Sequence, residues 1–132
     1  MLEEKKLQEI QKFWPKDAPN FLNVPKYIKK YRDDLIVIKY GGNVLIDRKI
    51  FNNFIEDVSI LNKLGLSIII VHGGGPRIER ELKKEKIQSK FINGLRVTDH
   101  KVIKIVEKVL IDFNNDIVSS LGAKDIDAVS IH

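Results

Sequence analysis

Cysteine is absent from this 132-residue chain, and so is any apolar run of bilayer-spanning length. Without cysteine there are no disulfides and no thiolate metal sites, which fits a reducing cytoplasm. A membrane-spanning helix needs about 20 apolar residues, whereas the longest apolar runs here have about six. The charged start at residues 1–6 also lacks the apolar stretch of a secretory signal. We therefore expect a cytoplasmic protein without a membrane partner.

Metal-ligand clusters and nucleic-acid signatures are missing as well. No group of histidines or carboxylates has metal-ligand spacing, so we expect no metal site in this chain. The net charge is +5, but lysines and acids alternate along the expected helices, without an arginine-rich stripe or interleaved aromatics. This pattern favours a solvated surface over a nucleic-acid partner.

The 43% apolar fraction is enough for one domain with a buried core. Periodicity predicts an α/β fold with a mainly parallel open sheet and helices on both faces, because strands and helices alternate and the strands are apolar throughout. We expect a helical N-terminal extension over residues 1–34 and one domain over residues 35–132. The expected helices cover residues 2–13, 21–32, 47–64, 76–85 and 98–121, the strands cover 35–40, 67–72 and 127–131, and a hairpin within 87–97 turns at Asn93–Gly94.

Two glycine-rich turns each follow a run of apolar β-formers. The first is KYGGN at residues 39–43, and the second is HGGGP at residues 72–76. Each turn places flexible backbone with exposed N–H groups where a strand ends and a helix begins, and open α/β sheets bind anions there. Two such turns predict a site for phosphate and carboxylate groups. Neither matches a dinucleotide fingerprint or a P-loop.

Within the first turn, Lys39 is a candidate for placing a positive charge on a phosphate while Gly41 and Gly42 grip its oxygens. The alternative is a lysine that extends into solvent at the sheet edge. Within the second turn, three consecutive glycines exceed what a simple turn requires, so we expect a ligand close to the backbone. His72 is either an acid–base group or, in the preferred interpretation, a residue that fixes the loop by hydrogen bonding.

Arg96 follows in the segment NGLRVTD at residues 93–99. Its planar fork can hold a carboxylate in bidentate fashion, and the alternative is a surface salt bridge. The acids on the expected helices are interpreted as solvated faces. They include Glu79, Glu81, Asp112 and Asp116.

With these motifs in place, the chain resembles the N-acetylglutamate kinase branch of the amino acid kinase family. The resemblance rests on IVIKYGGNVL, IIVHGGGPRI and NGLRVTD in this order and spacing, and runs from about Phe21 to Ile131. It implies phosphoryl transfer from ATP, with Mg²⁺, to the side-chain carboxylate of N-acetyl-L-glutamate in arginine biosynthesis. It also implies a catalytic Lys39 and nucleotide-phosphate contacts at Gly41 and Gly42. For the substrate it implies contacts at Gly74, Gly75 and Arg96.

The resemblance covers only the amino-terminal part of that family. Family members continue into an ATP-binding half, which supplies further catalytic groups, so we expect this chain to be the substrate-binding half and inactive alone. That half is a possible separate partner. Asn114 or Asn115 is the candidate for a family asparagine, although the lysine that follows it in the family is acidic here.

Three alternatives remain open. The first is a non-catalytic acetylglutamate-binding module, the second is a structural partner of a full-length kinase, and the third is another member of the amino acid kinase family. The segment at residues 27–32 resembles the end of an N-terminal helix that interlaces dimers in arginine-inhibited forms. Homo-oligomers through that helix, or through the central sheet and helices, are therefore possible, and the alternative is a helix that packs on its own domain.

Overall fold

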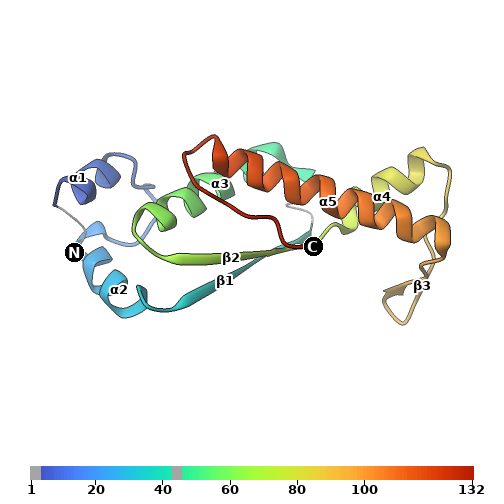
Figure 1. Cartoon of the computed structure of the whole chain (residues 1–132), viewed down its shortest axis with the longest axis horizontal. Helices are drawn as coiled ribbons and strands as arrows, with labels where there is room; N and C mark the ends of the chain where they lie inside the picture. The colour runs from blue at the N-terminus through green and yellow to red at the C-terminus, as the bar shows by residue number, and fades with distance from the viewer. Residues whose placement is uncertain (1–3, 43–45) are drawn as a thin grey trace.

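The structure is a computed structural model that describes residues 4–42 and 46–132, so expectations that fall on Leu2 and Asn43 lie outside the described residues. The molecule is elongated, with the N-terminal helices at one end, two strands in the middle and a small hairpin at the other end (Figure 1). In chain order the elements are α1 (Glu4–Lys12), the 3-10 helix η1 (Phe21–Asn23), α2 (Val24–Tyr31), β1 (Leu35–Tyr40), α3 (Arg48–Lys63), β2 (Ser67–His72), α4 (Gly75–Lys84), β3 (Phe91–Ile92), β4 (Leu95–Arg96) and α5 (His100–Gly122).

Strands β1 and β2 pair in parallel, in a register that runs from Leu35 opposite Ser67 to Tyr40 opposite His72. Parallel neighbours need a crossover, and α3 provides it. This arrangement confirms the predicted α/β class with parallel pairing.

The main core lies between one face of this sheet and helices α3 and α5, which lie on the same side of the strands (Figure 1). Phe113 of α5 has no exposed surface and is surrounded by the rings of Tyr40, Phe51 and His72. Tyr40 also stacks on Phe54 of α3, with ring centroids 4.0 Å apart. This aromatic cluster joins the end of β1 to both helices.

The other face of the sheet differs from the expected cover of helices. Leu35 and Val37 of β1 are 61% and 60% exposed, and Ile69 and Val71 of β2 are 38% and 50% exposed. We call these four residues the open sheet face. Strand alternation explains it, because the same strands send their other side chains into the core. The continuous apolar pattern of β1 and β2 is typical of strands that are covered on both faces. Among the described residues, only the face toward α3 and α5 is covered.

The segment at residues 127–131 does not form the expected third strand. It runs beside β2, and its residues alternate between exposed and partly buried as in a strand, yet no ladder joins it to β2. A strand assignment requires backbone pairing as well as side-chain alternation, and here the two segments line a common cavity without pairing. The sequence pattern thus predicted the alternation of exposed and partly buried side chains correctly, but the prediction of a third strand was wrong.

Local turn and cap chemistry follows the sequence closely. The Asp47 carboxylate accepts from the backbone N–H of Ile50, which caps α3, and Gly65 ends that helix with φ +87°. Asp99 caps α5 by accepting from the N–H groups of Lys101 and Val102. Asn93 and Gly94 both have positive φ, as a two-residue hairpin turn requires. One expected helix, over residues 21–32, is instead the 3-10 helix η1 followed by α2.

The N-terminal extension packs on its own chain. Ile10 of α1 and Val24 of α2 are buried in a second cluster with Ile60 of α3 and with Leu64, which caps that helix. This is the second of the two alternatives for the extension. Oligomer formation through it stays a prediction, as does the division into residues 1–34 and 35–132.

We predict that Phe113→Ala lowers the free energy of unfolding by about 3–5 kcal/mol, because it leaves a cavity where three rings meet. Urea titration followed by circular dichroism measures the loss. Ile103→Ala is the matched control on the exposed side of α5, and it should cost less than about 1 kcal/mol. Phe113→Leu, which keeps most of the volume, should fall between them. Equal losses at positions 113 and 103 would contradict this account of the core.

Candidate functional site

The two glycine-rich turns lie side by side at the carboxyl edge of the sheet. Tyr40 and His72 are the last paired residues of the two strands, and the backbone N–H of Gly73 donates to the carbonyl of Tyr40 at 2.9 Å. Parallel pairing thus brings together segments that are more than thirty residues apart in the sequence. It places both turns at the position where open α/β sheets bind ligands.

His72 takes the structural role that was preferred from the sequence. Its Nδ1 donates to the carbonyl of Gly73 at 3.0 Å, and its ring meets Phe113 edge-on with centroids 5.0 Å apart. Because a carbonyl only accepts, this contact requires the Nδ1-protonated tautomer. The histidine fixes the start of the second turn against the core.

In the first turn, Lys39 projects from the same side of β1 as Leu35 and Val37, so its ammonium lies on the exposed side of the sheet. In the register it stands opposite Val71, one step before the carboxyl edge. Among the described residues, a Cβ added at Gly41 or Gly42 would meet nothing within 4 Å, and Gly42 has φ +73°. The backbone of this turn therefore has free space beside it, which fits a bound phosphate. Asn43 lies outside the described residues.

In the second turn, Gly74 and Gly75 have different surroundings. Gly74 is buried before α4, and a Cβ there would lie 2.6 Å from Cδ2 of Leu110 on α5. Gly75 is exposed, begins α4, and a Cβ there would meet nothing within 4 Å. Gly74 is thus required for helix packing, whereas Gly75 leaves open space at the helix N-terminus. Gly74 also has φ −153°, so left-handed backbone is not the reason for a glycine there.

Arg96 reaches the same region from the hairpin. It pairs with Phe91 across the β3–β4 ladder, and its guanidinium carbon lies 4.7 Å from the centre of the Phe91 ring. Its Nη1 donates to Oε2 of Glu79 on α4 at 3.1 Å. Arg96 therefore forms the salt bridge considered from the sequence, but a half-buried one in which its side chain is only 15% exposed.

Glu79 is a residue whose importance sequence reasoning missed. Ser89 donates to its carboxylate at 2.6 Å, and Arg96 donates both to Ser89 and to Glu79. The hydrogen bond from Ser89, and after it that from Arg96, hold the pKa of the Glu79 carboxyl below its usual value. One sequence signal could have indicated it: Glu79 lies four residues after Gly75, so the two residues share one face of the expected helix. The other acids considered pair with cations whose side chains are more exposed than that of Arg96: Glu81 with Lys84, Asp112 with Lys108 and Asp116 with Arg77.

Residues of α4 and of the β3–β4 hairpin line an open pocket of about 620 Å³, which we call the α4 pocket. Gly75 and Arg96 meet in it, although they come from different elements. Three of its side chains are cationic and one is anionic, so it carries an excess of positive charge. Its lining consists of Gly75, Pro76, Glu79, Arg80, Lys83, Phe91 and Arg96. Of the expected site residues, Lys39, Gly41, Gly42 and Gly74 do not line it.

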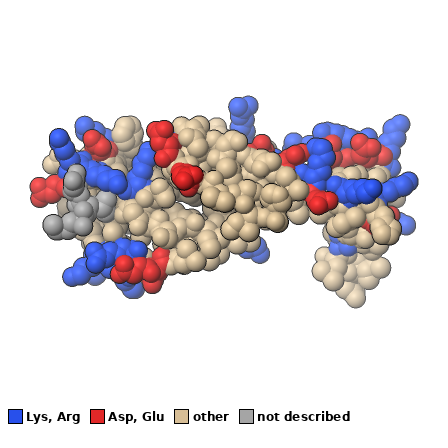
Figure 2. Space-filling model, viewed as in Figure 1, with Lys and Arg blue, Asp and Glu red and all other residues tan. Residues whose placement is uncertain are grey.

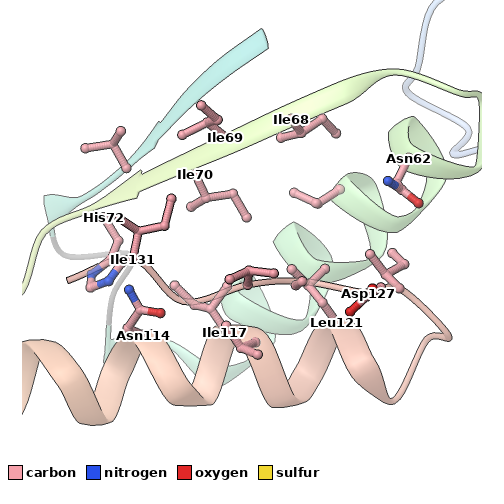
Figure 3. A pocket seen from close by; sticks show the side chains of 16 residues that line it. Asn62, Ile68, Ile69, Ile70, His72, Asn114, Ile117, Leu121, Asp127 and Ile131 are labelled. Carbon is pink, nitrogen blue, oxygen red and sulfur yellow. The ribbon is translucent and has the colours of Figure 1, made fainter. Parts of the chain in front are cut away.

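A second cavity, of about 590 Å³, lies along the edge of β2. Ile68, Ile70 and His72 project towards it from the strand, Ile117 and Leu121 line it from α5, and the C-terminal segment passes between them (Figure 3). Asn114 also lines this cavity, whereas Asn115 is exposed. Because its walls are mostly isoleucine and valine, its chemistry is that of an unfilled packing region rather than of an anion site.

In the described ranges, 4–42 and 46–132, no three His, Cys, Asp or Glu residues come together to hold a metal ion. Nor do they contain a helix that is long and apolar enough to span a membrane. Basic and acidic side chains intermix at both ends of the visible face, with uncharged surface between them (Figure 2).

Alanine at the two glycines should change stability in opposite directions. Gly74→Ala forces the Leu110 side chain aside, and overpacking of this kind costs about 1–3 kcal/mol. Gly75→Ala removes a flexible residue from the first turn of α4 without a clash, and should stabilise the chain by up to about 1 kcal/mol. Thermal melts of the two variants in parallel test this. Destabilisation by Gly75→Ala as large as that by Gly74→Ala would contradict the different packing of the two positions.

Known proteins resemble this chain in sequence and in fold. The sequence profile of the Amino acid kinase family matches residues 34–132. An acetylglutamate kinase of Pelagibacter ubique is 53% identical over 124 residues, which are 94% of this chain and 43% of that protein. One of Clostridium acetobutylicum is 45% identical over 76% of this chain and 37% of that protein. This chain thus spans less than half the length of these relatives.

Among solved structures, an N-acetylglutamate synthase of Neisseria gonorrhoeae, complexed with coenzyme A and N-acetyl-glutamate, has the same fold. The TM-score is 0.71 at 22% identity, over 84% of this chain and 26% of that one. A second crystal structure of that enzyme, with coenzyme A and L-arginine, gives a TM-score of 0.62. The profile match over most of the chain, together with the identity to two acetylglutamate kinases, shows that this chain belongs to the amino acid kinase family.

Proposed function

We propose that this chain is the acetylglutamate-binding part of an acetylglutamate kinase. The observation that carries the proposal is the α4 pocket, where the helix N-terminus at Gly75 and the guanidinium of Arg96 face one cationic space. Helix N-termini and arginine forks both favour carboxylates. The identity to acetylglutamate kinases supports N-acetyl-L-glutamate as the carboxylate ligand.

On this proposal Arg96 holds the α-carboxylate, and the backbone at Gly74 and Gly75 contacts the rest of the substrate. An oxygen of the side-chain carboxylate attacks the terminal phosphorus of ATP, the bond from that phosphorus to the bridging oxygen breaks, and an acyl phosphate and ADP result. Lys39 is the catalytic residue, since phosphoryl transfer depends mainly on positioning and on neutralising charge. Gly41 and Gly42 receive phosphate oxygens in the free space beside their backbone. The reaction would be a step of arginine biosynthesis in the cytoplasm.

The chain is proposed to need the remaining part of a longer protein, or a separate polypeptide equivalent to it. Its relatives are more than twice the length that it matches. The open sheet face, with Val37, Ile69 and Val71, and the isoleucine-lined cavity along β2 are surfaces that such a part would cover. We assign the ATP base and Mg²⁺, which prefers carboxylate oxygens and water, to that part.

A non-catalytic acetylglutamate-binding module is the second candidate. It is favoured by the position of Lys39, which does not line the α4 pocket that contains Arg96. The two candidates predict the same substrate binding but differ in turnover once the ATP-binding part is supplied.

We predict that the 132-residue chain binds N-acetyl-L-glutamate but does not phosphorylate it with ATP and Mg²⁺. Hydroxylamine trapping of the acyl phosphate measures the reaction. Turnover of about 1–100 s⁻¹, as in ordinary kinases, would show that the chain is complete as an enzyme. Addition of the carboxyl-terminal part of a relative then separates the candidates, because restored turnover supports the kinase and binding without turnover supports the module.

For Arg96 we predict that Arg96→Lys weakens the binding of N-acetyl-L-glutamate by about tenfold or more, since a point charge does not replace a bidentate fork. Isothermal titration calorimetry on the chain measures the affinity. Arg32→Lys is the matched control, because Arg32 follows α2 at the other end of the molecule (Figure 1) and forms an ion pair with exposed Asp33. Unchanged affinity in Arg96→Lys would contradict carboxylate binding by Arg96, and its role would then be the salt bridge to Glu79.

A further inference from the structure

Arg96 is held by three contacts before any ligand arrives. Its Nη1 donates to Glu79 and to Ser89, and its guanidinium lies over the ring of Phe91. Phe91 belongs to the same hairpin as Arg96, whereas Glu79 lies on α4 and Ser89 in the segment between them. The guanidinium thus has fixed neighbours on three separate segments.

These contacts occupy only part of the hydrogen-bonding capacity of the Arg96 guanidinium. A guanidinium has five N–H donors in a planar fork. All hydrogen bonds that Arg96 donates from its side chain among the described residues come from Nη1. Nε and Nη2 form a second bidentate edge of the same plane, and among the described residues this edge donates no hydrogen bond.

From this arrangement we propose that Glu79 is a positioning residue for carboxylate binding, which holds Nη1 of Arg96 so that the Nε–Nη2 edge serves the ligand. The inference rests on the proposed function for the identity of the ligand, but its structural part does not. The anchoring carboxylate does not cancel the attraction of the α4 pocket, because Arg80 and Lys83 also line it. Ser89 completes the arrangement by donating to Glu79 while it accepts from Arg96.

An opposite role for Glu79 is conceivable on the same contacts. A carboxylate within 3.1 Å of the arginine could compete with the ligand, which would then have to displace it. The two roles predict opposite changes in ligand affinity when Glu79 is replaced. If Glu79 positions the arginine, its removal weakens ligand binding, and if it competes, its removal strengthens binding.

The first experiment needs no ligand. In the ¹⁵N-labelled chain, rotation about the Nε–Cζ bond of Arg96, which exchanges Nη1 with Nη2, should be slow because Glu79 and Ser89 hold Nη1, so separate Nη1 and Nη2 signals are expected. Glu79→Ala should merge or broaden them. Glu79→Gln, which keeps an acceptor oxygen, should partly restore them. Glu81→Ala is the matched control, because Glu81 is on the same helix and pairs with Lys84 instead. Averaged signals in the unaltered chain, or no change in Glu79→Ala, would overturn the proposal.

The second experiment titrates the same variants with N-acetyl-L-glutamate. Glu79→Ala should bind about tenfold more weakly, in keeping with the loss of a hydrogen bond to a charged group. Glu79→Gln should lie between it and the unaltered chain, and Glu81→Ala should bind normally. Equal or tighter binding by Glu79→Ala contradicts the positioning role. If the unaltered chain does not bind N-acetyl-L-glutamate at all, the proposed function fails, and the signals of Arg96 still decide whether Glu79 holds its guanidinium.

Discussion

The parallel pairing of β1 with β2 is the constraint on which the rest of the site depends. With Tyr40 opposite His72, both strands end at the same level, and the hydrogen bond from Gly73 to Tyr40 continues the pairing into the turns. A slip by one residue would also exchange the faces of a strand and expose its core side chains. The aromatic packing around Phe113 opposes such a slip, because Tyr40 and His72 both contact that ring.

From this edge the site extends through α4 and the hairpin. Gly74 lets α4 approach α5 closely at Leu110, and a third apolar cluster with Ile78 and Leu82 holds the two helices together. The close approach sets where the first turn of α4 lies, and thereby where Gly75 meets Arg96. Gly74 thus allows the close helix packing, whereas its neighbour Gly75 lines the α4 pocket.

Much of this arrangement could be predicted from the sequence because it depends on local chemistry. The caps at Asp47 and Asp99, the turn at Asn93–Gly94 and the apolar strands each act within a few residues. The sequence also placed the two glycine-rich turns correctly at the ends of β1 and β2, whereas the binding roles of these turns and of Arg96 stay predictions. The sequence likewise indicated that His72 fixes its loop.

What could not be predicted depends on distant partners. The role of Glu79 requires Ser89 and Arg96, which the hairpin brings back onto α4. The failure of residues 127–131 to pair depends on the backbone of β2, which side-chain alternation does not reveal. In the same way, apolar strands indicate that two faces are suited to burial, but not which segment buries each face.

The open sheet face has a consequence for biosynthesis. In a longer protein that contains this sequence near its start, the paired strands can form as soon as β2 and α5 have left the ribosome. At about 5–20 residues per second, a following segment of similar length takes on the order of ten seconds to be made. During that interval Val37, Ile69 and Val71 remain accessible to chaperones and to other nascent chains. Translation speed after α5 therefore determines how long this surface must be protected.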